Sequence, residues 1–530
     1  MKTLQAVSPL DGVQIGEFES TTPEAIRQKM QTARAASAAW AKVPVKQRSK
    51  VLAGLIPLIL EELDGICDLI AKTTGKVKTE ALLGEIYPVL DLCRHYQTHA
   101  AAILAPQPVA TSSLAFPAAT ARIERKPYGV VAVISPWNYP FQLSLAPMLT
   151  ALFAGNAVIL KPSEFSLPVG QLIVDLCDKL DLPAGLAQWI VGTGEAGQQL
   201  IDAGPDLVFF TGGLNTGRAV MQRAALHPIP VMLELGGKDP MIVFADADLP
   251  RAADAAIYGA FCNSGQACVS VERLYLQRAC HDEFLQLLLD KVAKLRVGHG
   301  EFGDLGAMTS ARQIEIVQAH YQDAIALGAK ASGPFACNGN YVKPVVLWNV
   351  HAGMRVMREE TFGPLLPVMA FGTEDEAVQL ANACELGLNA SIWSKDINKA
   401  ERIARLLETG NWAVNDVMKN IGHAGLPFGG VKKSGFGRYH GAEGLLNFTY
   451  AVSGLTNHSR LAKEPNWFPY GEQRYQQFKS YLDFVYGSGP WLQRARSNQQ
   501  ALQAFREYSG IDWTQTWHNL QLMLPWKRRN

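Results

Sequence analysis

A carboxylate and a cysteine stand in turns that could bring a base and a nucleophile together. Glu234 ends the apolar run PVMLEL and precedes the glycine-containing segment LGGK. Cys268 ends NSGQAC, a second turn with a glycine. A thiol becomes an effective nucleophile when a neighbouring group takes its proton. The pair therefore predicts covalent catalysis on Cys268, with Glu234 as the base.

Other polar and glycine-rich segments also follow apolar runs. Trp137 and Asn138 come after VVAVIS, and KPSE at 161–164 comes at the end of NAVILK. The turns GTGEAG at 192–197 and TGGLNTG at 211–217 could each bind a diphosphate at a helix N-terminus. The first lacks the acidic ribose ligand expected roughly 20 residues downstream, so the spacing leaves both turns as candidates.

The elements that must position these residues follow an α/β pattern. The spacing of apolar residues over 22–104 predicts amphipathic helices that cover a sheet. Short β-rich runs then recur with room for one helix between them, which is typical of parallel sheets. They begin near residues 130, 156, 186, 207 and 230 and, in a second series, near 241, 274, 365, 391 and 412. We expect two α/β domains with a boundary near Gly236 and Gly237, and ligands outside the carboxyl ends of the strands.

Size and composition agree with a packed enzyme. A chain of 530 residues exceeds what one core holds, and 48% hydrophobic content is ordinary for a globular protein. The net charge of +1 argues against nucleic acid as a partner. The eight cysteines are scattered, so we expect reduced thiols and no metal site. We see no signal peptide or apolar span of about 18 residues, and we expect a cytoplasmic protein.

Taken together, the motifs resemble the aldehyde dehydrogenase superfamily over residues 7–455. PWNYP, KPSE, FTGGLNTG, ELGGK, NSGQAC, EETFGP and LPFGGVKKSG stand in the family's order and approximate spacing. The resemblance implies an α/β fold of two doubly wound parallel-sheet domains, one Rossmann-like for the cofactor and one catalytic, plus a small β oligomerisation arm. We assign 1–112 and 129–235 to the NAD(P)-binding domain, 236–420 to the catalytic domain, 113–128 and 440–456 to the arm, and 461–530 to an aromatic-rich C-terminal extension.

The resemblance also implies roles for single residues. Cys268 attacks the aldehyde carbon, the Asn138 amide and the Cys268 N–H hold the oxyanion, and Glu234 activates water to hydrolyse the thioester. NAD is the expected cofactor because Glu164 would accept ribose hydroxyls and repel a 2′-phosphate, with NADP as the alternative. The residues expected to contact the cofactor are Trp137, Lys161, Ser163, Glu164, Gly194, Gly212, Gly213, Gly217, Leu235, Glu360 and Phe362.

The resemblance further implies that one face of the helix expected after Asn138 lines the substrate tunnel. Tyr139, Leu143 and Ala146 recur at helical spacing. The remaining residues expected in the tunnel are Ala267, Val269 and Phe428. Because this set contains no Arg or Lys, it favours an uncharged aliphatic or aromatic aldehyde over a semialdehyde with a carboxylate.

Two other activities stay open at this point. A CoA-acylating dehydrogenase would have no use for a water-activating Glu234, and a non-redox cysteine hydrolase would need a histidine partner that no motif supplies. We expect self-association as a homodimer or homotetramer. The extension combines many aromatics with an excess of basic residues, and we expect it to pack on protein, with membrane contact as the less favoured alternative.

Overall fold

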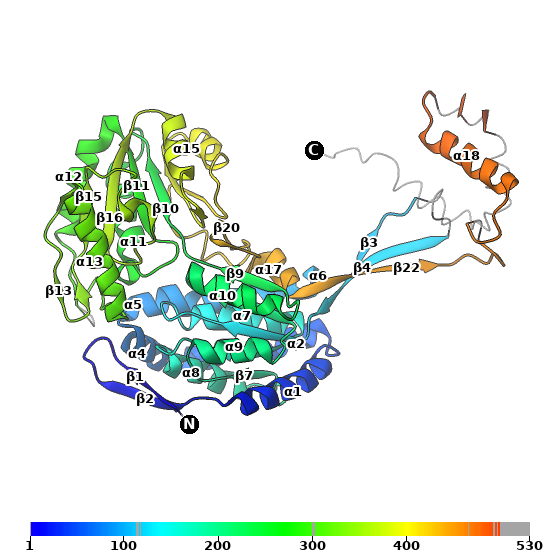
Figure 1. Cartoon of the computed structure of the whole chain (residues 1–530), viewed down its shortest axis with the longest axis horizontal. Helices are drawn as coiled ribbons and strands as arrows, with labels where there is room; N and C mark the ends of the chain where they lie inside the picture. The colour runs from blue at the N-terminus through cyan, green and yellow to red at the C-terminus, as the bar shows by residue number, and fades with distance from the viewer. Residues whose placement is uncertain are drawn as a thin grey trace. The chain divides into compact units, whose positions relative to one another are not determined.

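The computed structural model describes residues 2–112, 116, 118–298, 303–464, 466–490, 493–494 and 497–498. The chain divides into two compact units, one of residues 1–104 and 126–450 and the other of residues 105–125 and 451–530 (Figure 1). The final part of the predicted extension, 499–530, lies outside the described residues. No helix in the described ranges is long and apolar enough to cross a membrane.

The first sheet of the larger unit has the strand order β21-β9-β8-β5-β6-β7. Its neighbours are parallel except for the β21 and β9 pair. β5, β6 and β8 are buried at every position, as expected for strands covered on both faces. The strands are β5 (Val130–Ile134), β6 (Ala157–Lys161), β7 (Ala187–Trp189), β8 (Leu207–Thr211), β9 (Val231–Glu234) and β21 (Gly435–Phe436). The first series of predicted strands is thereby confirmed.

Helices connect and cover these strands. The crossover helices are α7 (Gln142–Ala154), α8 (Leu167–Asp178), α9 (Gly194–Asp202) and α10 (Leu214–Ala225). α7 packs against β5, β6, α2 and α6 and is buried along its whole length, which explains its lack of a polar face. The predicted N-terminal helices are α1 (Pro23–Trp40), α2 (Val45–Leu52), α3 (Leu55–Glu61), α4 (Leu63–Thr74), α5 (Lys78–Ala81), the π-helical turn η1 (Leu82–Ile86) and α6 (Tyr87–Ile103), preceded by the hairpin β1 (Thr3–Val7) and β2 (Gln14–Glu19).

The second sheet has the order β12-β15-β16-β11-β10-β18-β19, with only β12 antiparallel to its neighbour. Its strands are β10 (Asp239–Val243), β11 (Val271–Gln277), β12 (Lys330–Ala331), β15 (Val345–Trp348), β16 (Leu365–Phe371), β18 (Ser391–Trp393) and β19 (Ala413–Val414). Its helical segments are α11 (Leu249–Phe261), η2 (Cys262–Gly265), η3 (Arg278–Cys280), α12 (His281–Val292), α13 (Ala311–Ala326), α14 (Arg355–Arg358), α15 (Glu374–Asn382) and α16 (Ile397–Ala404). β12 and β15 are additions to the predicted set.

A link of four residues carries the chain from the first sheet into the second. β9 ends at Glu234, the chain continues through Leu235, Gly236, Gly237 and Lys238, and β10 begins at Asp239. The carboxyl edge of the first sheet therefore leads directly to the amino edge of the second.

Small pairs and the second unit complete the described fold. The pairs are β13 (Cys337–Asn338) with β14 (Tyr341–Val342) and β17 (Leu386–Gly387) with β20 (Val431–Lys432), and α17 (Gly441–Asn447) follows. β3 (Gln107–Val109), β4 (Ala119–Pro127) and β22 (Thr449–Asn457) form a three-stranded sheet, most of it in the second unit. α18 (Glu472–Tyr486), also in that unit, has no buried residue.

Candidate active site

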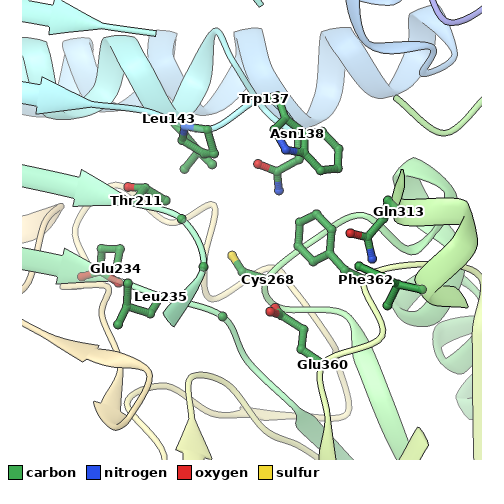
Figure 2. A pocket seen from close by; sticks show the side chains of 15 residues that line it. Trp137, Asn138, Leu143, Thr211, Glu234, Leu235, Cys268, Gln313, Glu360 and Phe362 are labelled. Atoms are coloured by element: carbon green, nitrogen blue, oxygen red, sulfur yellow. The ribbon is translucent and has the colours of Figure 1, made fainter. Parts of the chain in front are cut away.

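A cavity of about 310 Å³ lies where the two sheets meet (Figure 2). The predicted nucleophile Cys268, base Glu234 and amide donor Asn138 all line it. The other predicted residues in its wall are Trp137, Leu143, Gly212, Gly213, Leu235, Glu360 and Phe362. Residues distant in sequence thus surround one space, with the Cys268 thiol pointing into it.

The two sheets contribute opposite edges to this cavity. Asn138 follows β5, Thr211 ends β8 and Glu234 ends β9, so the first sheet contributes carboxyl ends of neighbouring strands. This is the edge at which α/β sheets bind ligands. Cys268, by contrast, lies just before β11, and Glu360 lies just before β16. The expectation that all site residues follow strands is wrong for the second sheet, whose amino edge faces the cavity.

A strained turn places the cysteine. Asn263, Ser264 and Gly265 have positive φ angles of 51°, 54° and 75°, a conformation that costs non-glycine residues free energy and persists only where the surroundings fix it. The Asn263 N–H donates to Glu80 Oε1 at 2.6 Å, and the Ser264 hydroxyl donates to the Gly306 carbonyl at 2.7 Å. These contacts determine where the chain enters Cys268.

Asn138 is held on both its backbone and its side chain. Its carbonyl accepts from Lys76 Nζ at 2.8 Å and from Asn263 Nδ2 at 3.0 Å. Its Nδ2 donates one hydrogen to the Gln266 carbonyl at 3.0 Å. A carboxamide has two such hydrogens, and Figure 2 shows this amide directed into the cavity on the side of Cys268. The second N–H is thus oriented toward an oxygen that would develop beside the thiol.

Burial raises the proton affinity of the two reacting groups. Desolvation raises the pKa of the Cys268 thiol far above its ordinary value, and the nearby Glu360, Asp239 and Glu234 carboxylates add to this effect. Desolvation also holds the pKa of Glu234 well above its usual range, against the opposing charge of Arg438. Neither Glu234 carboxylate oxygen has a hydrogen-bond partner among the described residues. A buried, unpartnered carboxylate of this kind can accept a proton near neutral pH.

Gly236 and Gly237, in the link between β9 and β10 (the glycine link), lie close to Glu360 and Cys268 across the cavity. The Gly237 N–H donates to Glu360 Oε1 at 3.2 Å. A Cβ atom on Gly236 would lie 2.2 Å from Glu360 Oε2, and one on Gly237 would lie 2.3 Å from the Cys268 carbonyl oxygen. Gly237 therefore needs glycine because a Cβ there would strike backbone that cannot rotate away, whereas a Cβ at Gly236 would require the Glu360 carboxylate to move.

Gly237→Ala is expected to lower kcat/KM for an aldehyde by roughly 100-fold, because displacing the Cys268 backbone by about 1 Å misplaces the thiol. Steady-state kinetics, with the melting temperature alongside, test this. Gly65→Ala is the matched control, since a Cβ there meets nothing within 4 Å. Wild-type kinetics in Gly237→Ala would contradict the steric argument.

Several predicted residues lie away from the cavity wall. Of the expected tunnel residues only Leu143 lines the cavity. Tyr139 precedes α7, and Lys76 Nζ lies 3.9 Å from its ring centroid. The others, which are Ala146, Ala267, Val269 and Phe428, lie in the hydrophobic core around the first sheet.

The remaining cofactor candidates also lie outside the wall, along the same carboxyl edge. Lys161 ends β6, is buried and pairs with Glu164 at 3.6 Å, with Ser163 between them. Gly194 begins α9. Gly217 lies in α10, where a Cβ would approach Leu235 Cδ2 to 2.6 Å.

Sequence reasoning missed part of the wall. Thr211 and Pro136 belong to TGGLNTG and PWNYP, motifs that we did single out, so their place in these motifs was the available signal. Gln313 and Ile316 come from α13 and are three residues apart, which places them on one helix face. Nothing in the motif pattern marked that helix. Within the described ranges, no group of three or more His, Cys, Asp or Glu side chains could hold a metal ion.

Comparison with known proteins agrees with this geometry. The sequence profile described as the aldehyde dehydrogenase family matches residues 1–453. The chain is similar to a 4,4′-diapolycopene aldehyde oxidase of Methylomonas sp, with 68% identity over 528 residues and 100% of both chains covered. It is also similar to a crystal structure of an NAD-dependent aldehyde dehydrogenase from Sinorhizobium meliloti, with 34% identity, a TM-score of 0.83, and 88% of this chain and 93% of that chain covered.

A third relative comes from a structure with a cofactor. It is a betaine aldehyde dehydrogenase from Staphylococcus aureus crystallised in complex with NAD+, with 30% identity, a TM-score of 0.82, and 88% of this chain and 93% of that one covered. The family profile and these relatives confirm the resemblance seen in the motifs. The chain belongs to the aldehyde dehydrogenase family.

Proposed function

We propose that the protein oxidises an apolar aldehyde to its carboxylic acid, with NAD+ as the hydride acceptor and a thioester on Cys268 as the intermediate. The observation that supports this most is a single cavity that Cys268, Glu234 and Asn138 share with Glu360 and Phe362. Overall, one aldehyde, one NAD+ and one water give one acid, one NADH and one proton.

The chain's own groups support each step. Glu234, with its raised pKa, is suited to accept the thiol proton, after which Cys268 Sγ bonds to the aldehyde carbon. The carbonyl oxygen gains negative charge, which the Asn138 amide stabilises. Glu234 releases the thiol proton to solvent. Once the hydride has left, Sγ carries an acyl group, and the ionised Glu234 takes a proton from the water that attacks the acyl carbon and returns it to the sulfur. The C–S bond breaks, and the thiol and the free acid result.

The cavity wall fits a dinucleotide. Gly212 and Gly213 lead from β8 into α10, where free N–H groups can meet a diphosphate. The Glu360 carboxylate can accept ribose hydroxyls, and the Phe362 ring lies edge-to-face with Trp137 at a centroid distance of 5.5 Å. When bound, NAD+ supplies the hydride acceptor. Glu164, which is partly exposed beside Lys161, favours NAD+ because a 2′-phosphate would meet its charge.

Glu234 also discriminates between acyl acceptors. Its buried, unpartnered carboxylate suits activation of water, and a thioester destined for CoA would need protection from such a base. This supports hydrolysis over CoA acylation. A non-redox cysteine hydrolase is less well supported, because no histidine among the described residues lines the cavity to serve as a partner for Cys268.

The aldehyde is proposed to be long and apolar. Leu143, Trp137, Ile316 and Phe362 line the cavity, and no Arg or Lys of the described part of the chain does. One relative that matches the whole length of this chain, C-terminal extension included, is named a 4,4′-diapolycopene aldehyde oxidase. The same substrate class is consistent with this lining, since each buried methylene contributes about 0.8 kcal/mol to binding.

A chain-length series tests the substrate class. Turnover of n-alkanals, retinal-like polyene aldehydes, betaine aldehyde and succinic semialdehyde would be followed by NADH absorbance. We expect kcat/KM to rise by up to roughly tenfold for each two added methylenes, with the charged aldehydes poorest. Preference for betaine aldehyde or the semialdehyde would contradict the proposal. Parallel reactions with NADP+ are expected to be slower.

We also propose self-association as a homodimer or homotetramer in the cytoplasm. The three residues of β3 are all exposed at one edge of the three-stranded sheet. Such an edge can pair with another chain. Sedimentation velocity would distinguish dimer from tetramer, and a monomer would contradict the proposal.

A further inference from the structure

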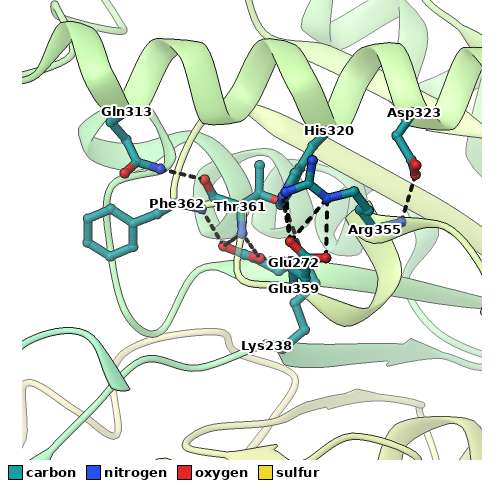
Figure 3. A network of polar contacts seen from close by, with 9 residues as sticks. All are labelled: Lys238, Glu272, Gln313, His320, Asp323, Arg355, Glu359, Thr361 and Phe362. Atoms are coloured by element: carbon teal, nitrogen blue, oxygen red, sulfur yellow. Dashed lines mark hydrogen bonds and ion pairs between the residues drawn. The ribbon is translucent and has the colours of Figure 1, made fainter. Parts of the chain in front are cut away.

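The segment between α14 and β16 carries both Glu360 and Phe362, yet it belongs to neither element. Phe362 has a φ of 51°, a left-handed conformation that a bulky aromatic residue rarely adopts. Such a conformation persists only where other contacts hold it. The contacts in question converge on the residue between the two, Thr361, which is fully buried (Figure 3).

Every polar group of Thr361 has a partner. Its N–H donates to both oxygens of the Glu272 carboxylate, at 3.1 and 2.8 Å. Its hydroxyl lies 3.2 Å from Lys238 Nζ and 3.1 Å from His320 Nδ1. Its carbonyl accepts from Gln313 Nε2 at 2.8 Å.

Glu272 also fixes the next residue and is itself fixed. Its Oε1 accepts from the Phe362 N–H at 2.9 Å. Lys238 Nζ lies 2.5 Å from its Oε2, and the two side chains are 0% and 4% exposed respectively. Glu272 lies at the start of β11, four residues after Cys268, and Lys238 closes the glycine link. The ion pair thus ties the strand that follows the nucleophile to the segment that carries Glu360 and Phe362.

A buried ion pair is weak evidence for stability, because desolvation of the two charges offsets their attraction. The position of the Lys238–Glu272 pair, beside the segment that carries Glu360 and Phe362, indicates a role other than stability. We propose that Glu272 and Lys238 are positioning residues, which clamp Thr361 so that Glu360 and Phe362 face the cavity in the geometry that hydride transfer requires. This rests on the proposed roles of Glu360 and Phe362.

If Glu272 and Lys238 position Thr361, variants of these residues should lower kcat while the protein stays folded. In Glu272→Gln one of the two acceptor oxygens becomes a donor facing Lys238 and the Thr361 N–H. The double variant Lys238→Met/Glu272→Gln removes both charges of the pair, so neither residue is left as a buried charge without its partner. In both variants kcat is expected to fall 10- to 100-fold, because the hydride acceptor is misplaced. The primary isotope effect on kcat, measured with a 1-deuterated aldehyde, should increase. KM for the aldehyde should change less than threefold.

Three further measurements separate positioning from folding. Glu272→Asp, which keeps the charge, should recover part of kcat. NAD+ binding by calorimetry should weaken less than kcat falls, and the melting temperature of the double variant should stay near that of the wild type. Asp246→Asn is the control, because it weakens an ion pair away from the cavity wall, Lys399–Asp246 at 2.9 Å, which joins the segment after β10 to α16, and it should leave kcat unchanged.

The outcomes are distinguishable. Unchanged kcat and isotope effect in Glu272→Gln and in the double variant would overturn the clamp. A fall in kcat that follows loss of folded protein, with no rescue by Glu272→Asp, would also overturn it. If Glu360→Gln and Phe362→Ala were themselves fully active, the proposed cofactor contacts would fail and the clamp would lose its purpose. The clamp is supported only if those two variants, Glu272→Gln and the double variant are all slow, and Glu272→Asp recovers part of kcat.

Discussion

Cys268→Ala is expected to abolish aldehyde oxidation, with kcat at least about 10⁴-fold below wild type. Without the sulfur no covalent adduct forms, and an aldehyde carbon that stays trigonal has no hydride to release. Steady-state NADH production and mass spectrometry of enzyme quenched during turnover measure this. The wild type should gain the mass of one acyl group, and the variant should gain none.

Cys262→Ala is the matched control for that experiment. Cys262 lies six residues before Cys268 and is buried, with its thiol 3.7 Å from the Met418 sulfur. Burial raises the pKa of Cys262 to about 12, and it does not line the cavity. Its alanine variant should keep near-wild-type turnover. Residual oxidation by Cys268→Ala, or acylation of Cys262 in the wild type, would remove Cys268 from its assigned role.

Glu234→Gln is expected to separate the two halves of the reaction. The glutamine keeps the shape of the side chain but cannot take a proton from water, so the acyl group should stay on Cys268. One equivalent of NADH per active site should appear at a reduced rate, followed by turnover roughly 10² to 10⁴ times slower than in wild type. Stopped-flow absorbance resolves the burst from the steady state.

The pH dependence gives the same test a second readout. Glu234 must be ionised to act as a base, and its pKa is raised by burial. Wild-type hydrolysis should therefore be slow at acidic pH and increase as pH rises through that raised pKa. In Glu234→Gln this rise should disappear. A Gln variant with equal steady turnover and the wild-type pH profile would assign the base to another group.

The sequence could predict most of the two sheets, for a physical reason. Strands such as VVAVI and LVFFT are buried on both faces, so their composition alone marks them. β12 escaped prediction because it is two residues long and forms the sheet edge, where local pattern carries little information. β15 is different, because its run VVLW is apolar and mostly buried like the predicted strands, and we did not single it out.

The site was predictable only where chemistry stands in a motif. Cys268, Glu234 and Asn138 carry their reactive groups in recognisable segments, and they share the cavity. Glu272 and His320 meet Thr361 through the packing of distant elements, which no spacing in the chain expresses. Tyr139 was grouped with Leu143 by helical periodicity, and the Leu143 N–H does donate to the Tyr139 carbonyl, but the Tyr139 ring packs against Lys76 and does not line the cavity.

The four-residue link between β9 and β10 has a consequence for the nascent chain. The link carries the chain from Glu234 into the second sheet, but β21, the strand that pairs with β9 at Glu234, is made only after every strand of that second sheet. A chain that stops before residue 435 therefore contains Cys268 and Asn138 but lacks the strand that borders the base. The surroundings of Glu234 are completed last, when almost all of the family-matched segment has been synthesised.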